Sequence, residues 1–249
     1  MHKVKYFLWR TRYYIFFLFC IAIFSIIYQY TSILSIHQVI LDSSNGEKLS
    51  YVDKDKAESD INWVNGKKYF NINIEDIKKV FNNNPFVSSI LVTKIFPNTI
   101  LVYIKERKPF VSLEIDNNTC VLLDQESFVL SKSDGNCADI NTKYMPIQLS
   151  IEDPKISFVE NTQSTYYQVS NIVKITKIFA QYNLGITKIT IKNTVMAVNA
   201  NEKKNFVFSL NQDIVEQLTR MSAVMPQIEM SQIKYTSLDL RFERPVLTK

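Results

Sequence analysis

Histidine and glycine are scarce in this sequence, and their scarcity removes several classes of enzyme. The 249 residues include 2 His, 4 Gly, 7 Pro and 3 Cys. Both histidines, His2 and His37, lie near the N-terminus, so no Ser-His-Asp or Cys-His catalytic site can form in the distal part of the chain. Two distal cysteines fall short of the three or four ligands of a zinc site, and the glycines are too scattered for a phosphate-binding loop. We therefore expect no catalysis, no metal and no cofactor.

Charge is absent from residues 13–41, which contain no Asp, Glu, Lys or Arg. A helix rises about 1.5 Å per residue, so the apolar part of this run is long enough to cross roughly 30 Å of bilayer hydrocarbon. Tyrosine and tryptophan, which favour the headgroup level, lie at both ends of the run: Trp9, Tyr13, Tyr14, Tyr28 and Tyr30. The sequence predicts a transmembrane helix at residues 13–35.

Residues 1–12 hold Lys3, Lys5, Arg10 and Arg12 and no acid, so we expect this tail to be cytoplasmic and the bulk of the chain to lie across the membrane. A cleaved signal peptide is the alternative, but its apolar core would be about 7–15 residues and would end in small residues. Here the apolar core is longer, and bulky aromatics follow it.

Most of the net charge of +5 comes from the N-terminal tail. The remainder of the chain has 25 basic and 24 acidic residues, and so carries no basic stripe for nucleic acid. The tail itself suits an anionic lipid bilayer. Hydrophobic residues make up 46% of the chain, enough for a packed core, and the few Gly and Pro exclude a low-complexity stalk.

The region after the membrane segment predicts a small sheet with two helices on one face. Asp53 and Asn73 are suited to cap the helices, and Pro85 follows the second. The predicted order is strand, helix, helix, strand, strand, at residues 36–41, 53–64, 74–82, 86–96 and 100–106. The Glu106-Arg107-Lys108-Pro109 run ends this pattern.

The rest of the chain predicts a second domain rich in strands. We expect strands at 111–115, 120–123, 128–130, 186–191, 195–200, 206–210 and 233–242, with a short last segment at 246–249. Helices are predicted at 166–182 and from a cap at Asn211 to Pro226. Residues 131–141 are predicted as a loop, and the stretch to about Thr162 gives no firm signal. Cys120 and Cys137 flank a predicted hairpin, so a disulfide is possible, but the sequence alone does not fix their separation.

Several motifs in order resemble the FtsQ/DivIB family of bacterial cell-division proteins. They are Pro85-Phe86-Val87, Val92-Thr93-Lys94, Phe96-Pro97-Asn98-Thr99-Ile100, Glu106-Arg107-Lys108-Pro109, Leu122-Leu123-Asp124 and Ser237-Leu238-Asp239-Leu240-Arg241-Phe242. The resemblance covers essentially the whole chain, although the family's usual Gly after the Leu-Leu-Asp turn is Ser127 or absent.

The resemblance implies an α+β protein with four parts: a cytoplasmic tail at 1–12, a transmembrane helix at 13–35, a POTRA domain at 36–107 and a β domain at 108–249. The POTRA domain would have β-α-α-β-β order. The second domain would be mixed α/β, with a mainly antiparallel sheet and an exposed C-terminal edge strand. The expected location is the cell membrane at the division septum.

The resemblance also implies that the last strand binds the division proteins FtsB and FtsL by strand addition. Carried onto this sequence, the partner-binding residues are Arg241, Phe242, Glu243, Arg244, Val246 and Leu247. Alternation instead places Phe242 on the core face with Leu238 and Leu240, and both interpretations stay open. Two other functions also stay open: a different POTRA-bearing assembly or transport component, and a membrane-anchored hydrolase that uses acidic pairs.

Overall fold

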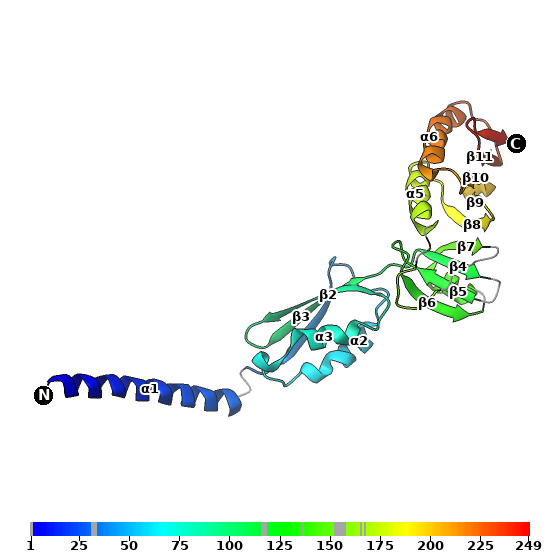
Figure 1. The fold of residues 1–249 in the computed structure, drawn as a ribbon. Helices are drawn as coiled ribbons and strands as arrows, with labels where there is room; N and C mark the ends of the chain where they lie inside the picture. Colours follow the sequence, from blue (N-terminus) through cyan, green and yellow to red (C-terminus); the bar gives the residue numbers. More distant parts are fainter. Residues whose placement is uncertain are drawn as a thin grey trace. The chain divides into compact units, whose positions relative to one another are not determined.

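The computed structural model describes residues 2–30, 34–115, 119–135, 137–151, 158–164, 166 and 168–249. The chain forms two compact units, shown in Figure 1. The first unit runs to Asn83 and resumes at Val87–Glu106, and the second unit contains Asn84–Phe86 and Arg107–Lys249. Arg107 was expected at the end of the first domain. It belongs to the second unit because its guanidinium lies 2.8 Å from the Asp124 carboxylate there.

Helix α1 (His2–Tyr30) opens the chain. Its side chains from Tyr13 to Ile27 are exposed, including Phe16 and Phe24 at 67% and 68%. No helix among the described residues has both the length and the apolar character required to cross a membrane. The predicted transmembrane helix is therefore unconfirmed, and its part at residues 31–33 lies outside the described residues.

The first unit is built on a three-stranded sheet. Its order is β1-β3-β2, with β1 parallel and β2 antiparallel to β3. Helices α2 and α3 lie together on one face of this sheet (Figure 1). The elements follow the expected strand-helix-helix-strand-strand order: β1 (Gln38–Ser43), α2 (Lys54–Ile61), α3 (Ile74–Phe81), β2 (Val87–Ile95) and β3 (Thr99–Glu106), with short 3₁₀ turns at Asn62–Val64 and Tyr69–Asn71.

Local capping explains where the two helices of this unit begin. The Asp53 side chain accepts a hydrogen bond from the Lys56 amide, and Asn73 accepts one from the Glu75 amide, both at 3.1 Å. Each cap satisfies an amide that has no partner inside the helix. The apolar stripes of α2 and α3 are buried at Ala57, Ile61, Ile77 and Phe81.

The second unit contains one mixed sheet of nine strands among the described residues. Its order is β12-β11-β10-β9-β8-β7-β4-β5-β6, and β7 is parallel to both of its neighbours. Five of its eight strand pairs are antiparallel, and the third parallel pair is β10–β11. The strands are β4 (Val111–Ile115), β5 (Thr119–Leu123), β6 (Val129–Asp134), β7 (Ile147–Ile151), β8 (Ile186–Lys192), β9 (Val195–Ala200), β10 (Asn205–Ser209), β11 (Ser237–Asp239) and β12 (Val246–Thr248).

Helices α5 (Gln168–Gln181) and α6 (Ile214–Met230) pack against this sheet on the side of β8 to β10 (Figure 1). Phe179 of α5 and Phe206 of β10 are both fully buried, with ring centroids 4.7 Å apart in an edge-to-face contact. This aromatic pair holds α5 against β10.

The expected loop at 131–141 is wrong at both of its ends. Strand β6 continues to Asp134, and α4 (Ala138–Tyr144) follows. The segment is polar and its apolar residues show no helical or strand periodicity, so its sequence does not predict its structure. A long-range bond holds it in place: Cys137, next to α4, is disulfide-bonded to Cys120 of β5. Strand β7, in the stretch that gave no firm signal, pairs in register with β4 and β8.

Helix α6 differs from its expected bounds at both ends. Asp213, not Asn211, caps it by accepting from the Val215 amide at 2.9 Å, and the helix continues through Pro226 to Met230. Proline lacks the N–H that would bond to the carbonyl four residues earlier. In α6 that carbonyl belongs to Ser222, and the Tyr182 hydroxyl donates to it at 3.3 Å. The Tyr182 hydroxyl thus replaces the backbone N–H that Pro226 lacks.

Candidate functional site

The candidate site is the C-terminal hairpin, where β11 and β12 end the large sheet. Strand β11 runs parallel to β10, and β12 pairs antiparallel with β11 through Leu238 and Leu247. Leu238 is fully buried, and Leu247 packs against the core. Core packing therefore holds the last strand in a fixed register.

The outer side of β12 offers backbone groups for pairing. The Thr236 N–H donates to the Thr248 carbonyl at 2.8 Å, so the backbone groups of Thr248 face β11. Because these groups alternate along an antiparallel strand, the N–H and C=O of Leu247 face outward. No strand among the described residues pairs with this side. Val246 adds a half-exposed apolar side chain at 49%.

The opposite edge of the same sheet is covered at its first residues. Val129 of β6 donates its N–H to the Thr162 carbonyl at 2.9 Å, and its own carbonyl accepts from Asn161 at 3.0 Å. Phe128 forms a bridge with Gln163. Proteins commonly shield sheet edges in this way, since an open edge pairs with other chains. The start of β6 is thus covered, whereas no described strand covers the outer side of β12.

Asp239 ends β11 and turns the chain into the loop that leads to β12. Its carboxylate accepts from the Arg241 amide at 3.1 Å, and the Arg241 guanidinium returns to it with Nη2–Oδ2 and Nε–Oδ1 distances of 2.7 and 3.0 Å. The strand predicted over 233–242 is therefore wrong in length, because this local turn stops it at Asp239. The two charges form an ion pair between residues two positions apart in the chain.

This turn places the remaining predicted site residues in a loop. Phe242 is 53% exposed, so the core position expected from alternation is wrong: the strand ends before it. The Arg241 guanidinium lies 5.6 Å from the centroid of the Phe242 ring, and the Arg241 carbonyl accepts from Gln212 at 3.0 Å. Glu243 and Arg244 are exposed in the loop and are not part of the edge strand. Val246 and Leu247 alone of the six lie in β12.

The ion pair makes the hairpin sensitive to acid. The hydrogen bonds from Arg241 hold the pKa of the Asp239 carboxyl below its ordinary value, against an opposite effect of burial. Such a carboxyl stabilises the fold above its unfolded pKa, and this stabilisation is lost as pH falls through the folded pKa. We expect Asp239→Asn to lower stability at pH 7 by less than about 1 kcal/mol, because the pair is partly exposed. Urea unfolding should show this difference shrinking as the pH falls below the ordinary pKa of an aspartate, and a difference that grows in acid would contradict it.

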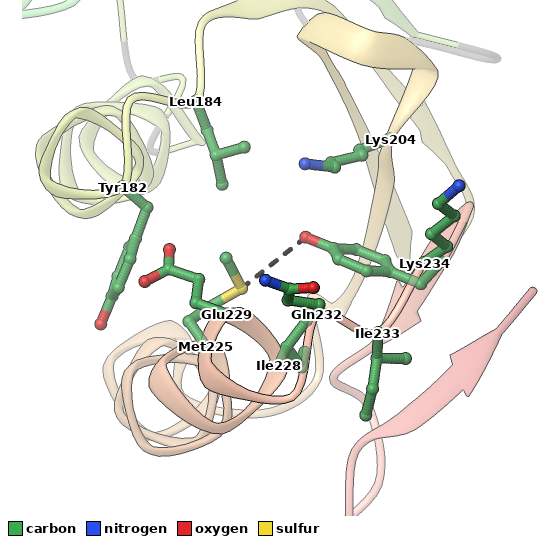
Figure 2. A pocket seen from close by; sticks show the side chains of 10 residues that line it. Tyr182, Leu184, Lys204, Met225, Ile228, Glu229, Gln232, Ile233 and Lys234 are labelled. Atoms are coloured by element: carbon green, nitrogen blue, oxygen red, sulfur yellow. Dashed lines mark hydrogen bonds between the residues drawn. The ribbon is translucent and has the colours of Figure 1, made fainter.

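A pocket of about 410 Å³ lies beside the start of β11 (Figure 2). Met225 and Ile228 of α6 form one wall, and Tyr182 and Leu184 after α5 form another. The Tyr235 hydroxyl lies 3.7 Å from the Met225 sulfur across the pocket, and Lys204, Lys234 and Glu229 add charge to its rim. This pocket left no signal in the sequence, since its walls come from separate segments between Tyr182 and Tyr235 that share no motif.

Cys120 and Cys137 are joined by a disulfide, with Cα atoms 5.1 Å apart. Cys120 is fully buried on β5, and Cys137 is 5% exposed. The bond ties the segment after β6 back to the start of β5. Among the described residues, no group of three or more His, Cys, Asp or Glu is arranged to hold a metal ion.

Comparison with known proteins relates the first unit to one domain type. Residues 45–107 match the family model of the POTRA domain, FtsQ-type. The chain is also 28% identical to the cell division protein FtsQ of Rickettsia bellii over 109 residues, and 27% identical to the proteins of the same name from Rickettsia felis and Rickettsia conorii. Each match covers 43% of this chain and 39% of the relative, so the chain spans about two fifths of the length of these curated relatives. These similarities support the family that the motifs predict.

Proposed function

We propose that this protein of the FtsQ/DivIB family is a non-catalytic scaffold of cell division, which binds small partner proteins by strand addition to β12. The observation that carries this proposal is the difference between the two ends of the large sheet: β6 is covered by residues 161–163, and β12 directs the Leu247 backbone outward. An extended partner segment would gain main-chain hydrogen bonds there. By family resemblance, the partners are of the FtsB and FtsL type.

Two features support a location at the cell membrane with the bulk of the chain outside the cytoplasm. The exposed apolar side chains of α1 are costly in water, and lipid would cover them. The Cys120–Cys137 disulfide suits an oxidising compartment, because cytoplasmic thiols are kept reduced. The basic tail with Lys3, Lys5, Arg10 and Arg12 then remains on the cytoplasmic side.

The shortage of catalytic groups supports a scaffold rather than an enzyme. Of the two histidines, His2 lies in the N-terminal tail and His37 follows the predicted membrane segment, with its Nδ1 2.6 Å from the Ser35 carbonyl. Neither belongs to the second unit, so that unit has no imidazole of its own to activate a nucleophile.

The test of this proposal blocks the edge without disturbing the core. Lysine on an edge strand opposes pairing with another chain. Val246 and Thr248 direct exposed side chains away from the core, so Val246→Lys/Thr248→Lys should fold normally. We expect the full chain with both changes to capture an FtsB/FtsL-type complex at least about tenfold more weakly, or about 1.4 kcal/mol.

Val215→Lys is the matched control, since Val215 is 48% exposed on α6. It should capture the partners like the wild type. Circular dichroism checks the fold of each variant. Unchanged capture by the Val246→Lys/Thr248→Lys variant would exclude strand addition to β12.

A further inference from the structure

The end of the first unit that receives the chain from α1 is fixed by backbone hydrogen bonds. The Tyr69 N–H donates to the Leu34 carbonyl at 2.7 Å, and the Ile36 N–H donates to the Lys67 carbonyl at 2.9 Å. On the other side, the His37 N–H donates to the Asn98 carbonyl at 3.0 Å. The segment from Leu34 to His37 is therefore held between the loop around residue 68 and the turn before β3.

Exposed aromatic residues gather at this same end. Phe70 and Phe96 are 64% and 66% exposed, and the Tyr69 ring lies edge-to-face with both, at centroid distances of 5.3 and 5.9 Å. Ile95, next to Phe96, is 44% exposed. Water-exposed aromatic side chains of this size are unusual on a soluble surface when they cluster. Trp63 adds a further ring nearby in sequence, with the Lys67 ammonium 4.1 Å from its centroid.

Lysines are the charged residues of the three segments that carry or adjoin these aromatic residues. Lys67, Lys68 and Lys94 accompany the aromatic residues, and the Lys94 ammonium donates to the Tyr69 carbonyl at 3.1 Å. No acidic residue occurs in the three segments concerned, residues 34–41, 61–73 and 94–101. The first acids of α3, Glu75 and Asp76, are paired with Lys78 and Lys79 at 2.7 and 3.1 Å. We call Tyr69, Phe70, Ile95 and Phe96 with Lys67, Lys68 and Lys94 the basal patch.

We propose that the basal patch binds the anionic headgroup layer of the membrane that α1 enters, and so sets which face of the first unit lies on lipid. This inference rests on the proposed membrane anchor. The three residues between Tyr30 and Leu34 span at most about 14 Å, whatever their conformation. Because Leu34 is bonded to Tyr69, the patch cannot lie far from the end of α1.

The side chains of the patch match the chemistry of that layer. Aromatic rings concentrate at the boundary between headgroups and hydrocarbon, and lysines such as Lys67 and Lys68 extend their ammonium groups from apolar stems to lipid phosphates. The Lys94 ammonium is instead bonded to the Tyr69 and Ile72 carbonyls and holds the loop that carries the rings. Anionic lipid attracts clustered lysines. A lipid surface thus satisfies the rings and the charges together, and the opposite end of the sheet stays in water.

A tryptophan reporter in the full chain tests this contact. In a Trp9→Phe/Trp63→Phe background, Phe96→Trp places the reporter in the basal patch just after β2, and Leu91→Trp places it on β2 itself. Leu91 is 61% exposed and lies about 16 Å away along the strand, so it is a matched control. In vesicles of brominated phosphatidylcholine with phosphatidylglycerol, we expect lipid quenching of the Phe96→Trp reporter to be at least twofold stronger.

Vesicle flotation separates the possible failures. Equal quenching of the two reporters in chains that float with the vesicles would overturn the basal patch and leave the anchor intact. Chains that do not float would overturn the anchor and this inference with it. Capture of FtsB/FtsL-type partners through β12 is measured independently of both outcomes.

The charge of the patch is tested by Lys67→Gln/Lys68→Gln in the Phe96→Trp chain. We expect its quenching to fall by about half in vesicles with phosphatidylglycerol and to change little in pure phosphatidylcholine. Lys54→Gln/Lys56→Gln is the control, because α2 begins beside Val52, whose amide is bonded to Glu106 at the far end of β3. Equal losses from both pairs, or none from either, would overturn the assignment of anionic lipid.

Discussion

Replacing both Cys120 and Cys137 with serine is expected to lower the free energy of unfolding of the second unit by about 3 kcal/mol. The disulfide closes a loop with a sequence separation of 17 residues, and the unfolded chain gains conformational freedom when that loop opens. Both sites are buried, so each serine also places a hydroxyl in an apolar setting. In calorimetry, the melting temperature should fall by roughly 10 °C.

Two controls show whether the loss of stability comes from the disulfide itself. Cys20→Ser should have no effect on this transition, since Cys20 is an exposed thiol on α1. A reducing agent should destabilise the wild type by a similar amount and leave the Cys120→Ser/Cys137→Ser variant unchanged. A loss below about 1 kcal/mol in that variant would show that the segment after β6 does not depend on the bond.

Glu106→Ala is expected to lower the stability of the first unit by about 3 kcal/mol. One Glu106 oxygen accepts from the amides of Tyr51 and Val52, at 2.8 and 2.7 Å, and the carboxylate also accepts from Ser50 at 3.0 Å. Hydrogen bonds to a charged group are worth more than neutral ones, and the alanine leaves several amides without this acceptor. The chain before α2 would lose its attachment to the end of β3.

Trp63 fluorescence in a Trp9→Phe chain reports this unfolding from within the first unit. Glu106→Gln keeps one carbonyl acceptor and should cost about half as much as Glu106→Ala. Glu58→Ala is the control: its pair with Lys54 spans 3.6 Å between exposed side chains and should contribute almost nothing. If Glu106→Ala and Glu58→Ala behave alike, the amide cluster is not a stabilising feature.

The sequence predicted the elements whose signals are local. Asp53 and Asn73 cap their helices as expected, because a cap depends only on the next three residues. Strands β8 and β9 follow from alternation between turn residues. Helix α4 and strand β7 were not predicted, since a disulfide and two parallel neighbours determine them. Such long-range partners leave no pattern in a short window of sequence.

In the candidate site too, features with a local sequence signal could be predicted, and features set by distant residues could not. Pro245 beside β12 was compatible with an edge strand, because proline removes a ladder donor. The sequence left two positions open for Phe242, and the core position fails because the Asp239–Arg241 pair bends the chain after β11 and overrides the alternation. The covering of β6 by Asn161 and Thr162 joins segments about thirty residues apart and needed the structure.

The hydrogen bond from Tyr182 to Ser222, which lets α6 continue through Pro226, also limits how the pocket of Figure 2 can change shape. Tyr182 lines that pocket from the α5 side, and Met225 lines it from α6. Moving the two helices apart would strip the Ser222 carbonyl of this donor, at a cost of about 1–3 kcal/mol if the group stays buried. A ligand that leaves this hydrogen bond intact must therefore fit between the two helices at their present spacing, and a bulkier group would be accommodated by rotamer changes of Met225 or Ile228.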